Sequence, residues 1–437
     1  MLPSRAGPYW RPRWARSERA RWATRRVIVT DHGPRRVSCT AARADLRLRH
    51  AERENILTAS TTLAQPTQRL DALTGLRWWA AFMVFFYHML VFAPLPGATS
   101  AVFAQGYLGV TFFFVLSGFV LTWSARPEVR QSTFYWRRFA RIYPSHFVAL
   151  ILAIPVFYTF APIPPDSFLK PVDPAILALS FVVLQGWWLA PIILFSGNPA
   201  AWTLTCEAFF YALHPYISKV LVPTARRGAL LIAGAIVLLA FGYRALAFGS
   251  PDAWFAHLSL PIVRLPEFAL GMALAWAIRS GWRIRIHPAL GVGAMGLVVG
   301  AIVLTSKYFV GLPVLSLVPV FGNELFTVAC ALAIVSIAQY TLEGKRSGFE
   351  TKLQVKLGEW SFAFYLVHAT FIYLALRIFG YQEPSWMNLA WFAALLAVDL
   401  TAAWALHHFI ERPIERRLRR WKDRKDAARL VPAAAQS

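Results

Sequence analysis

Long apolar stretches constrain this chain more than any other feature of its sequence. Eleven of them have nearly the length of a membrane-spanning helix, near residues 76–94, 107–124, 142–162, 175–192, 201–221, 228–247, 258–279, 288–305, 315–338, 357–378 and 388–410. The hydrocarbon core of a bilayer is about 30 Å thick, which a helix of roughly 20 apolar residues crosses. The stretches are continuous rather than alternating, which favours helices over barrel strands. The expected fold class is therefore an all-α, polytopic membrane helix bundle.

The composition supports a membrane protein and argues against two other classes. Hydrophobic residues make up 57% of the 437 positions and charged residues only 15%, which is too apolar for a soluble enzyme of this length. The net charge of +23 comes from Lys and Arg that lie mostly outside the apolar stretches, so we attribute it to membrane topology and expect no nucleic-acid partner. Cys39, Cys206 and Cys330 are far apart and show no CxxC spacing, so we expect packing residues and no metal site.

Basic clusters predict how the chain threads the bilayer, because they mark cytoplasmic loops. Both termini are then cytoplasmic, and residues 163–174 and 195–200 lie outside. The stretch 175–192 between these two outer loops should not cross. We therefore expect about ten transmembrane helices plus one non-spanning apolar segment, in the inner (plasma) membrane of the cell. The clusters lie in the N-terminal tail, 137–141, 225–227, 279–287, 344–356 and 415–425.

The N-terminal residues 1–67 differ from the rest of the chain. They hold thirteen Arg before residue 50 and no long apolar run, so they lack the hydrophobic core of a secretory signal. We predict a disordered basic extension; a transit-like presequence and an over-extended start of the reading frame stay open. The bundle is expected over 68–420, followed by a short cytoplasmic tail over 421–437.

Arg77 and His88 are unusual residues for the first apolar stretch. Eleven residues correspond to three helical turns plus about 20°, so both side chains share one face about 16 Å apart. Arg77 then lies at the cytoplasmic boundary and His88 beyond the middle of the membrane. The alternative is structural: Arg77 follows the positive-inside rule, and His88 makes a hydrogen bond between helices. An ionised residue at mid-bilayer costs about 2.5–3.5 kcal/mol on insertion scales, so such residues usually mark a path or a site.

The stretch NPAAWTLTCEAFFYALHP carries a second polar face. Glu207, Tyr211 and His214 are spaced i, i+4 and i+7, with Trp202 and Thr203 at the outer mouth. Glu207 is expected one or two turns from the outer surface. Alternatively, the aromatic residues form part of the interfacial belt and Glu207 pairs with another helix.

Further candidates lie elsewhere in the chain. His368 is expected at a depth comparable to that of His88. Arg138 and Arg141 would share a helix face suited to phosphate groups, since arginine presents a planar fork of donors; topology alone also explains them. Arg264 and Glu267 are three residues apart and are expected to pair with each other.

These stretches together resemble the acyltransferase 3 family of integral membrane O-acyltransferases. The resemblance covers residues 68–420. Thr203 and Thr205 stand where the family commonly has serines, and they keep a hydroxyl. The motifs that carry the resemblance are, in chain order, LDALTGLRWWAAFMVFFYH, GVTFFFVLSGFVLT, RRFARIYP, WTLTCEAFFY, LGEWSFAFYLVH and HHFIERPIE.

The resemblance implies an acyl-CoA donor, most often acetyl-CoA, no permanently bound cofactor, and a hydroxyl acceptor on a carbohydrate or glycosylated molecule. O-antigen, exopolysaccharide, peptidoglycan, lipid-linked oligosaccharide and a macrolide-like molecule all stay open as acceptors. The hypothesis assigns catalysis to His88, Glu207 and His368, donor binding to Arg77, Arg138 and Arg141, and substrate binding to Trp202, Thr203 and Tyr211.

Two mechanisms fit this assignment. His88 is either the general base for direct transfer or a nucleophile that carries the acyl group as an acyl-histidine. A secondary transporter with a buried path of His, Glu and Asp is the alternative from another class of protein.

Overall fold

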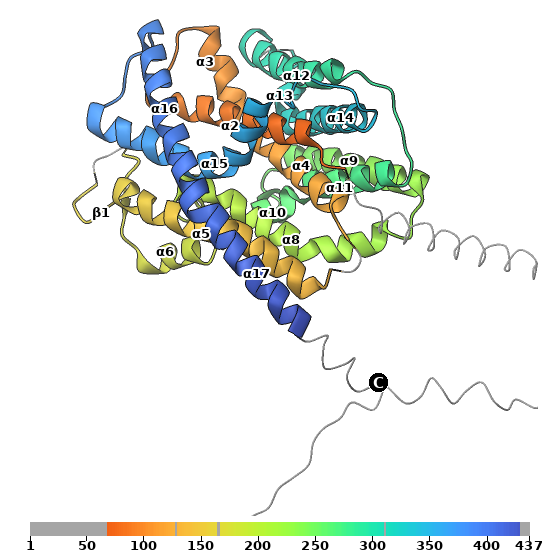
Figure 1. Cartoon of the computed structure of the whole chain (residues 1–437). Helices are drawn as coiled ribbons and strands as arrows, with labels where there is room; N and C mark the ends of the chain where they lie inside the picture. The colour runs from red at the N-terminus through yellow and green to blue at the C-terminus, as the bar shows by residue number, and fades with distance from the viewer. Residues whose placement is uncertain (1–67, 127–128, 164–166, 310–311, 429–437) are drawn as a thin grey trace, which may run out of the picture. The chain divides into compact units, whose positions relative to one another are not determined.

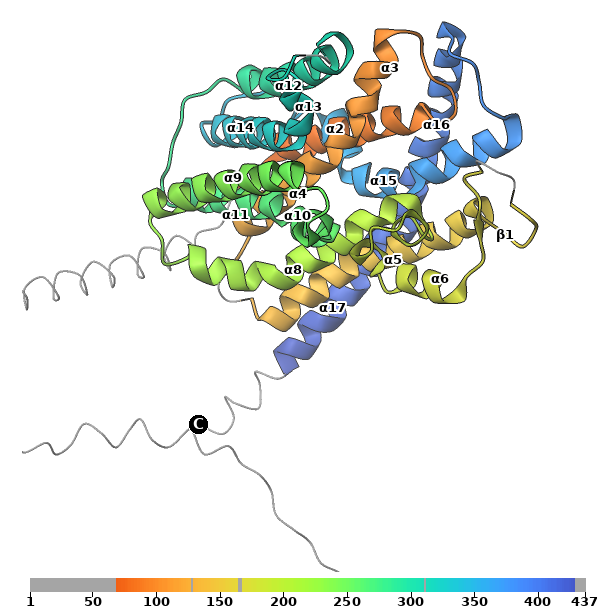
Figure 2. The same cartoon turned by 180° about the vertical axis from the view of Figure 1, so that it is seen from behind.

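The computed structural model describes residues 68–126, 129–163, 167–309 and 312–428. The predicted basic extension over 1–67 lies outside these residues. The long helices are α2 (Asp71–Met89), α4 (Gly109–Trp123), α5 (Gln131–Phe157), α8 (Trp202–Leu221), α9 (Arg226–Gly249), α11 (Leu265–Arg279), α12 (Pro288–Tyr308), α14 (Gly322–Leu342), α15 (Lys352–Phe379), α16 (Leu389–Ala405) and α17 (Arg412–Ala428). α17 packs along α5, and α9 lies beside α11 (Figures 1 and 2).

Short elements connect these helices. The strands β1 (Tyr158–Thr159) and β2 (Lys170–Pro171) form one parallel pair. The short helices are α3 (Ala98–Phe103), η1 (Ala104–Leu108), α6 (Pro174–Phe181), η2 (Gln185–Trp187), α7 (Pro191–Leu194), η3 (Pro199–Ala201), η4 (Trp254–His257), α10 (Leu260–Val263), α13 (Leu317–Val320), η5 (Trp386–Asn388) and the π-helix η6 (Leu406–Glu411). The predicted all-α, polytopic class is confirmed.

Eight helical segments in the described ranges are long and apolar enough to cross a membrane. α2 and α8, with 19 and 20 residues, fall outside this set. These are the two helices that carry Arg77, His88 and Glu207. By contrast, α9 exposes Leu231, Leu238 and other leucines, an apolar surface suited to lipid.

The apolar segment predicted not to cross forms short helices. α6 has eight residues, about 12 Å of helix, which cannot cross a bilayer core of about 30 Å. Pro174 occupies the first turn of α6, and Asp173 caps it by accepting from the amide of Ala175 at 2.9 Å. Val183 has a φ of 60°, an uncommon conformation for a β-branched residue, where the chain turns between α6 and η2.

Residues 195–200 form a turn that packs into the bundle. Ser196, Asn198 and Ala200 are buried, and the side of the membrane on which this turn lies stays a prediction. The Asn198 side-chain amide donates to the carbonyl of Leu366 on α15 at 2.6 Å, and its oxygen accepts from the Ala200 amide. Since these bonds satisfy the polar groups of this turn, α8 begins inside the bundle.

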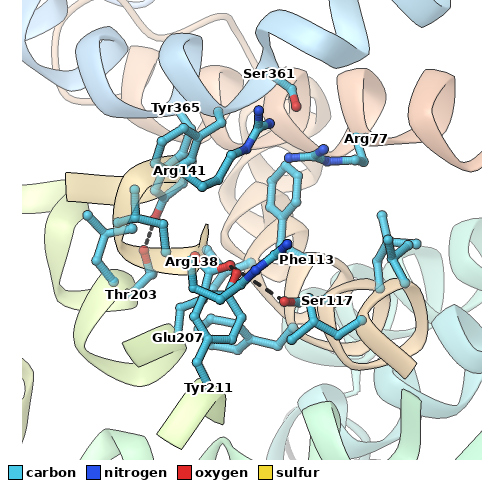
Figure 3. Close-up of a pocket in the computed structure, with 18 residues that line it drawn as sticks. Arg77, Phe113, Ser117, Arg138, Arg141, Thr203, Glu207, Tyr211, Ser361 and Tyr365 are labelled. Carbon is cyan, nitrogen blue, oxygen red and sulfur yellow. Dashed lines mark hydrogen bonds between the residues drawn. The ribbon is translucent and has the colours of Figure 1, made fainter. Parts of the chain in front are cut away.

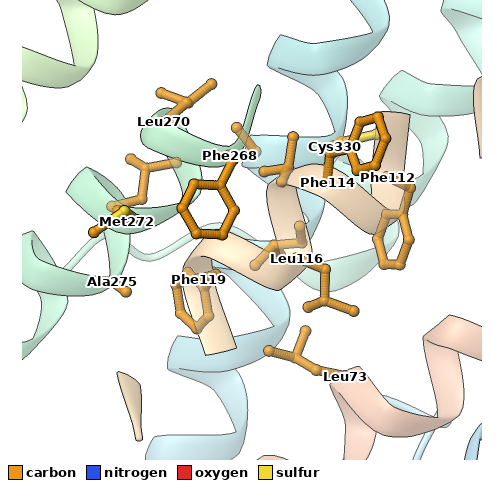
Figure 4. Packing of buried hydrophobic residues seen from close by; sticks show 14 of the residues in the cluster. Leu73, Phe112, Phe114, Leu116, Phe119, Phe268, Leu270, Met272, Ala275 and Cys330 are labelled. Carbon is orange, nitrogen blue, oxygen red and sulfur yellow. The ribbon is translucent and has the colours of Figure 1, made fainter. Parts of the chain in front are cut away.

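Close backbone approaches fix the helix packing. A Cβ atom at Gly358 on α15 would lie 1.8 Å from the carbonyl oxygen of Thr74, just N-terminal to Arg77 on α2. A Cβ atom at Gly118 on α4 would lie 1.9 Å from the carbonyl oxygen of Phe268 on α11. Only glycine permits these contacts. Around the second contact lies a core of phenylalanines and aliphatic side chains that includes Cys330; Figure 4 shows part of it. Cys206 and Cys330 are buried and free, as expected of packing residues.

Candidate active site

A cavity of about 160 Å³ lies between helices α2, α4, α5, α8 and α15 (Figure 3). We call it the central cavity. Six residues singled out from the sequence line it, from three separate helices: Arg77, Arg138, Arg141, Thr203, Glu207 and Tyr211. Ser117, Ser361 and Tyr365 add further polar groups, and the rest of the wall is apolar. The fold thus gathers residues that are up to 134 positions apart in the predicted set.

Glu207 is held inside the central cavity by hydroxyl groups. Its carboxylate accepts a hydrogen bond from Tyr211, one turn further along α8, and lies 3.5 Å from the Ser117 hydroxyl of α4. Arg138 points into the same cavity (Figure 3), with its guanidinium 5.9 Å from the ring centres of Phe134 and Tyr211. Arg138 forms no ion pair with any residue that the structure describes. A cation without a carboxylate partner in a cavity is available to an anionic ligand.

Arg141 has different surroundings, although it lies one helical turn after Arg138. It pairs with Glu411 at 2.8 Å and with Glu415 at 3.3 Å. These glutamates belong to the late motif HHFIERPIE, and the side chain of Glu411 is fully buried. The ion pairs therefore join α5 to η6 and α17. The π-helical turn that ends at Glu411 is a geometry found often at functional sites.

Thr203 and Tyr365 close one end of the central cavity. The Thr203 hydroxyl donates to the Tyr365 phenol oxygen at 3.1 Å, and that phenol lies 3.2 Å from the Ala200 carbonyl. On its other side, the Tyr365 ring contacts the imidazole of His368, with ring centres 5.6 Å apart. Tyr365 is therefore the side chain between the central cavity and His368.

His88 and His368 contact each other, with ring centres 5.0 Å apart in an edge-on arrangement. The Nδ1 of His368 lies 2.8 Å from the Tyr365 carbonyl, to which it must donate, so Nε2 is the unprotonated nitrogen of the neutral ring. That Nε2, and Nδ1 of His88, are buried without a hydrogen-bond partner among the described residues. We call these residues the imidazole pair. Neither lines the central cavity.

Other predicted residues lie away from this site. Trp202 packs edge-on against Phe114, with ring centres 6.4 Å apart, and does not line the central cavity. His214 lies 3.4 Å from the Thr122 hydroxyl and lines a separate cavity. The predicted pair of Arg264 with Glu267 is confirmed. In the described ranges, no cluster of three or more His, Cys, Asp or Glu is arranged to hold a metal ion.

Three residues of the site were not predicted from the sequence: Ser117, Ser361 and Tyr365. A usable signal was present for two of them. Ser361, Tyr365 and His368 are spaced i, i+4 and i+7 on α15, the same spacing that singled out Glu207 on α8. Ser117 gave no such signal, because a lone serine in an apolar helix commonly bonds its own backbone.

An apolar helix bundle with arginines, a glutamate and two imidazoles in its interior defines a multi-pass membrane protein with an internal polar site. Residues 70–408 match the family model described as an acyltransferase domain. The chain belongs to the acyltransferase 3 family. It is thus an acyltransferase for groups other than aminoacyl groups, not the transporter that the buried polar residues left open.

Curated relatives agree with this family. The chain is 35% identical to acyltransferase MdmB of Streptomyces mycarofaciens, over 80% of this chain and 93% of MdmB. It is 28% identical to exopolysaccharide production protein ExoZ of Rhizobium meliloti, over 76% of this chain and 96% of ExoZ. It is also 28% identical to peptidoglycan O-acetyltransferase OatA of Listeria monocytogenes, over 37% of this chain and 26% of OatA. No solved structure matches the chain significantly.

Proposed function

We propose that this membrane protein transfers an acetyl group from cytosolic acetyl-CoA to a hydroxyl group of a carbohydrate or glycosylated acceptor. Two relatives support the acceptor class through their names, one a peptidoglycan O-acetyltransferase and the other an exopolysaccharide production protein. The protein would lie in the inner membrane with both termini in the cytoplasm, where positive-inside topology puts its basic clusters.

One observation carries the proposal: Tyr365 both lines the arginine-lined cavity and contacts His368 of the imidazole pair. Arg77, Arg138 and Arg141 give the central cavity a positive potential that favours an anionic donor. The long, thin acyl arm of acyl-CoA enters the central cavity, and rotation of Tyr365 brings the thioester to the imidazole pair. The unbroken helix α2 sets the distance from Arg77 to His88 at about 16 Å, a span suited to such an arm.

In the direct mechanism, His88 is the general base. It removes the proton of the acceptor hydroxyl while that oxygen attacks the thioester carbonyl, because histidine accepts and returns protons near neutral pH. The carbon–sulfur bond then breaks, and the imidazolium returns the proton to the departing thiolate of CoA. His368 orients His88, and Glu207 orients the substrate. Thr203 and Tyr211, which line the central cavity, keep their predicted role in substrate binding.

A covalent route is the second version of the same function. An imidazole nitrogen of His88 attacks the thioester, CoA leaves, and the acceptor hydroxyl then takes the acyl group from the acyl-histidine. Single-turnover reactions with labelled donor separate the two versions. A labelled enzyme that forms without acceptor supports the covalent route, and its absence during turnover supports direct transfer.

The primary test is consumption of radiolabelled acetyl-CoA by purified protein. Wild type is compared with His88→Ala and Arg77→Ala at equal, folded levels. We expect wild type to cleave the thioester, even slowly to water, and His88→Ala to lose this activity while still binding the donor. Arg77→Ala should bind the donor more weakly. If none of the three proteins binds acyl-CoA at any concentration tried, the donor assignment is wrong.

A further inference from the structure

A second cavity, of about 440 Å³, adjoins the central cavity. Six of the ten residues that line it are arginines: Arg69, Arg77, Arg141, Arg412, Arg416 and Arg419. We call it the arginine basin. Glu359 and Glu415 are the carboxylates in its wall, so cations outnumber anions by four. An excess of positive charge in a concave site concentrates anionic ligands.

Three of the six arginines in the basin form ion pairs, and the other three form none with the described residues. Arg69 pairs with Glu359 at 2.9 Å, and this hydrogen bond raises the pKa of Arg69. Arg141 and Arg419 pair with Glu415. Arg77, Arg412 and Arg416 form no ion pair with any part of the chain that the structure describes. Arg412 and Arg416 are exposed on α17, one turn apart, and present a common face to the basin.

The arginine basin and the central cavity have walls in common. Arg77 and Arg141 line both of them. Figure 3 shows these two guanidinium groups at the same end of the central cavity, beside Ser361. A ligand with an anionic head in the basin would therefore place a thin chain past Arg77 into the central cavity.

We propose that the arginine basin binds the phosphate groups of the donor's nucleotide, with Arg412 and Arg416 as the principal contacts. This inference rests on the proposed function, because it locates the nucleotide end of the same acyl-CoA. The proposal places the phosphates away from Arg138 and Arg141, two of the arginines that were predicted from the sequence to bind the donor. Arg141 is already paired with two carboxylates, and Arg138 does not line the basin. Guanidinium groups match phosphate oxygens through paired hydrogen bonds.

Another cavity also meets the central one and offers a competing site. It has a volume of about 520 Å³ and shares Arg138 with the central cavity. Arg126, Arg137 and Lys219 line it, but Arg137 pairs with Asp423, and much of the wall is apolar. The anionic headgroups of membrane lipids are a second source of phosphate for the basin itself. The experiment must therefore separate both the position of the site and the source of the phosphate.

The test measures binding of adenosine 3′,5′-bisphosphate, which carries no acyl group or thiol, to the purified full chain by calorimetry. CoA is titrated in parallel. The basin variant is Arg412→Gln with Arg416→Gln. Its matched control is Arg417→Gln with Arg420→Gln, which removes two exposed arginines of α17 that do not line the basin. We expect the basin variant to weaken binding by at least about tenfold, since charge-assisted hydrogen bonds are lost, and the control by less than about twofold.

Two further arms make the result decisive. If Arg126→Gln weakens binding and the basin variant does not, the nucleotide lies in the other cavity and the proposal is overturned. Binding is also compared in phosphatidylcholine nanodiscs with and without phosphatidylglycerol. If the nucleotide still binds in the anionic nanodiscs, the result supports the basin as a nucleotide site. If anionic lipid abolishes nucleotide binding, the basin is a site for lipid headgroups and the proposal is overturned.

The failure of this inference differs from failure of the proposed function. If wild type consumes acetyl-CoA but the basin variant binds CoA as tightly as wild type, the basin assignment is wrong and the proposed function stands. If CoA binding depends on the basin but no acetyl group is transferred, the basin assignment stands and the reaction is wrong. Circular dichroism and thermal unfolding confirm that each variant is folded.

Discussion

The central cavity and the imidazole pair are neighbours with opposite character. The central cavity holds charged groups that are partly compensated: Arg141 pairs with Glu411 and Glu415, and Glu207 accepts hydrogen bonds from hydroxyls. The imidazole pair has no charged partner, and a nitrogen of each ring is buried without a hydrogen bond in the described part of the chain. The arginines of the central cavity are suited to binding an anionic donor. The imidazole nitrogens that have no hydrogen-bond partner among the described residues are suited to proton transfer. The contrast suggests that binding and reaction occupy separate layers of the bundle.

After the loss of activity expected for His88→Ala, the largest expected effect comes from His368→Ala, which removes the other half of the imidazole pair. Because His368 would orient the base, kcat for acetyl transfer should fall by about 10²- to 10⁴-fold, with KM for acetyl-CoA nearly unchanged. Steady-state kinetics measure both. The control is Thr370→Val, a buried position on the same helix. A raised KM with normal kcat would show that His368 serves binding, and the separation of layers would fail.

A smaller effect distinguishes two arginines of the central cavity that are one turn apart. Arg141→Ala leaves the buried Glu411 without its arginine partner, with only His407 at 3.4 Å, and should lower the free energy of unfolding by about 3 kcal/mol. Arg138→Ala removes an unpaired cation and should leave stability within about 1 kcal/mol of wild type, while weakening donor binding. Unfolding in mixed micelles and CoA titration measure the two quantities. Equal destabilisation by both changes would contradict the assignment of separate structural and binding roles.

The smallest effect is expected for Tyr365→Phe, at the boundary between the two layers. The ring that separates them stays, but the hydroxyl that bonds Thr203 and lies near the Ala200 carbonyl is lost. The expected cost is about 1 kcal/mol of stability, with activity changed by less than about tenfold. Thermal unfolding and turnover are the measurements. Activity as low as that of His368→Ala would instead place the phenol in the proton-transfer path.

Much of the fold was predictable, because lipid forces backbone polar groups to be satisfied within helices. The all-α class, the non-spanning stretch 175–192 and the pairing of Arg264 with Glu267 follow from hydropathy, loop charge and spacing. The buried start of α8 was not predictable in this way. It depends on Asn198 bonding to Leu366, a contact between residues 168 positions apart that leaves no local pattern.

The candidate site was predicted one helix at a time, and its assembly came only from tertiary packing. Spacing placed Arg77 and His88 on one face of α2 and Glu207 with Tyr211 on α8. Spacing gave no indication that Arg141 forms an ion pair with Glu411, because that contact joins helices far apart in the chain. Spacing also placed Trp202 beside Thr203, and in the structure its indole packs against Phe114 outside the lining of the central cavity. The roles of the site residues stay predictions.

The unbroken course of α2 fixes both the distance and the rotation between Arg77 and His88. A helix lengthens by about 1.5 Å and turns by about 100° with each added residue. Inserting one alanine between Arg77 and His88 would therefore change the measured length very little, yet turn the imidazole away from His368. The register of α2 therefore keeps His88 against His368 while Arg77 stays in the wall of the central cavity.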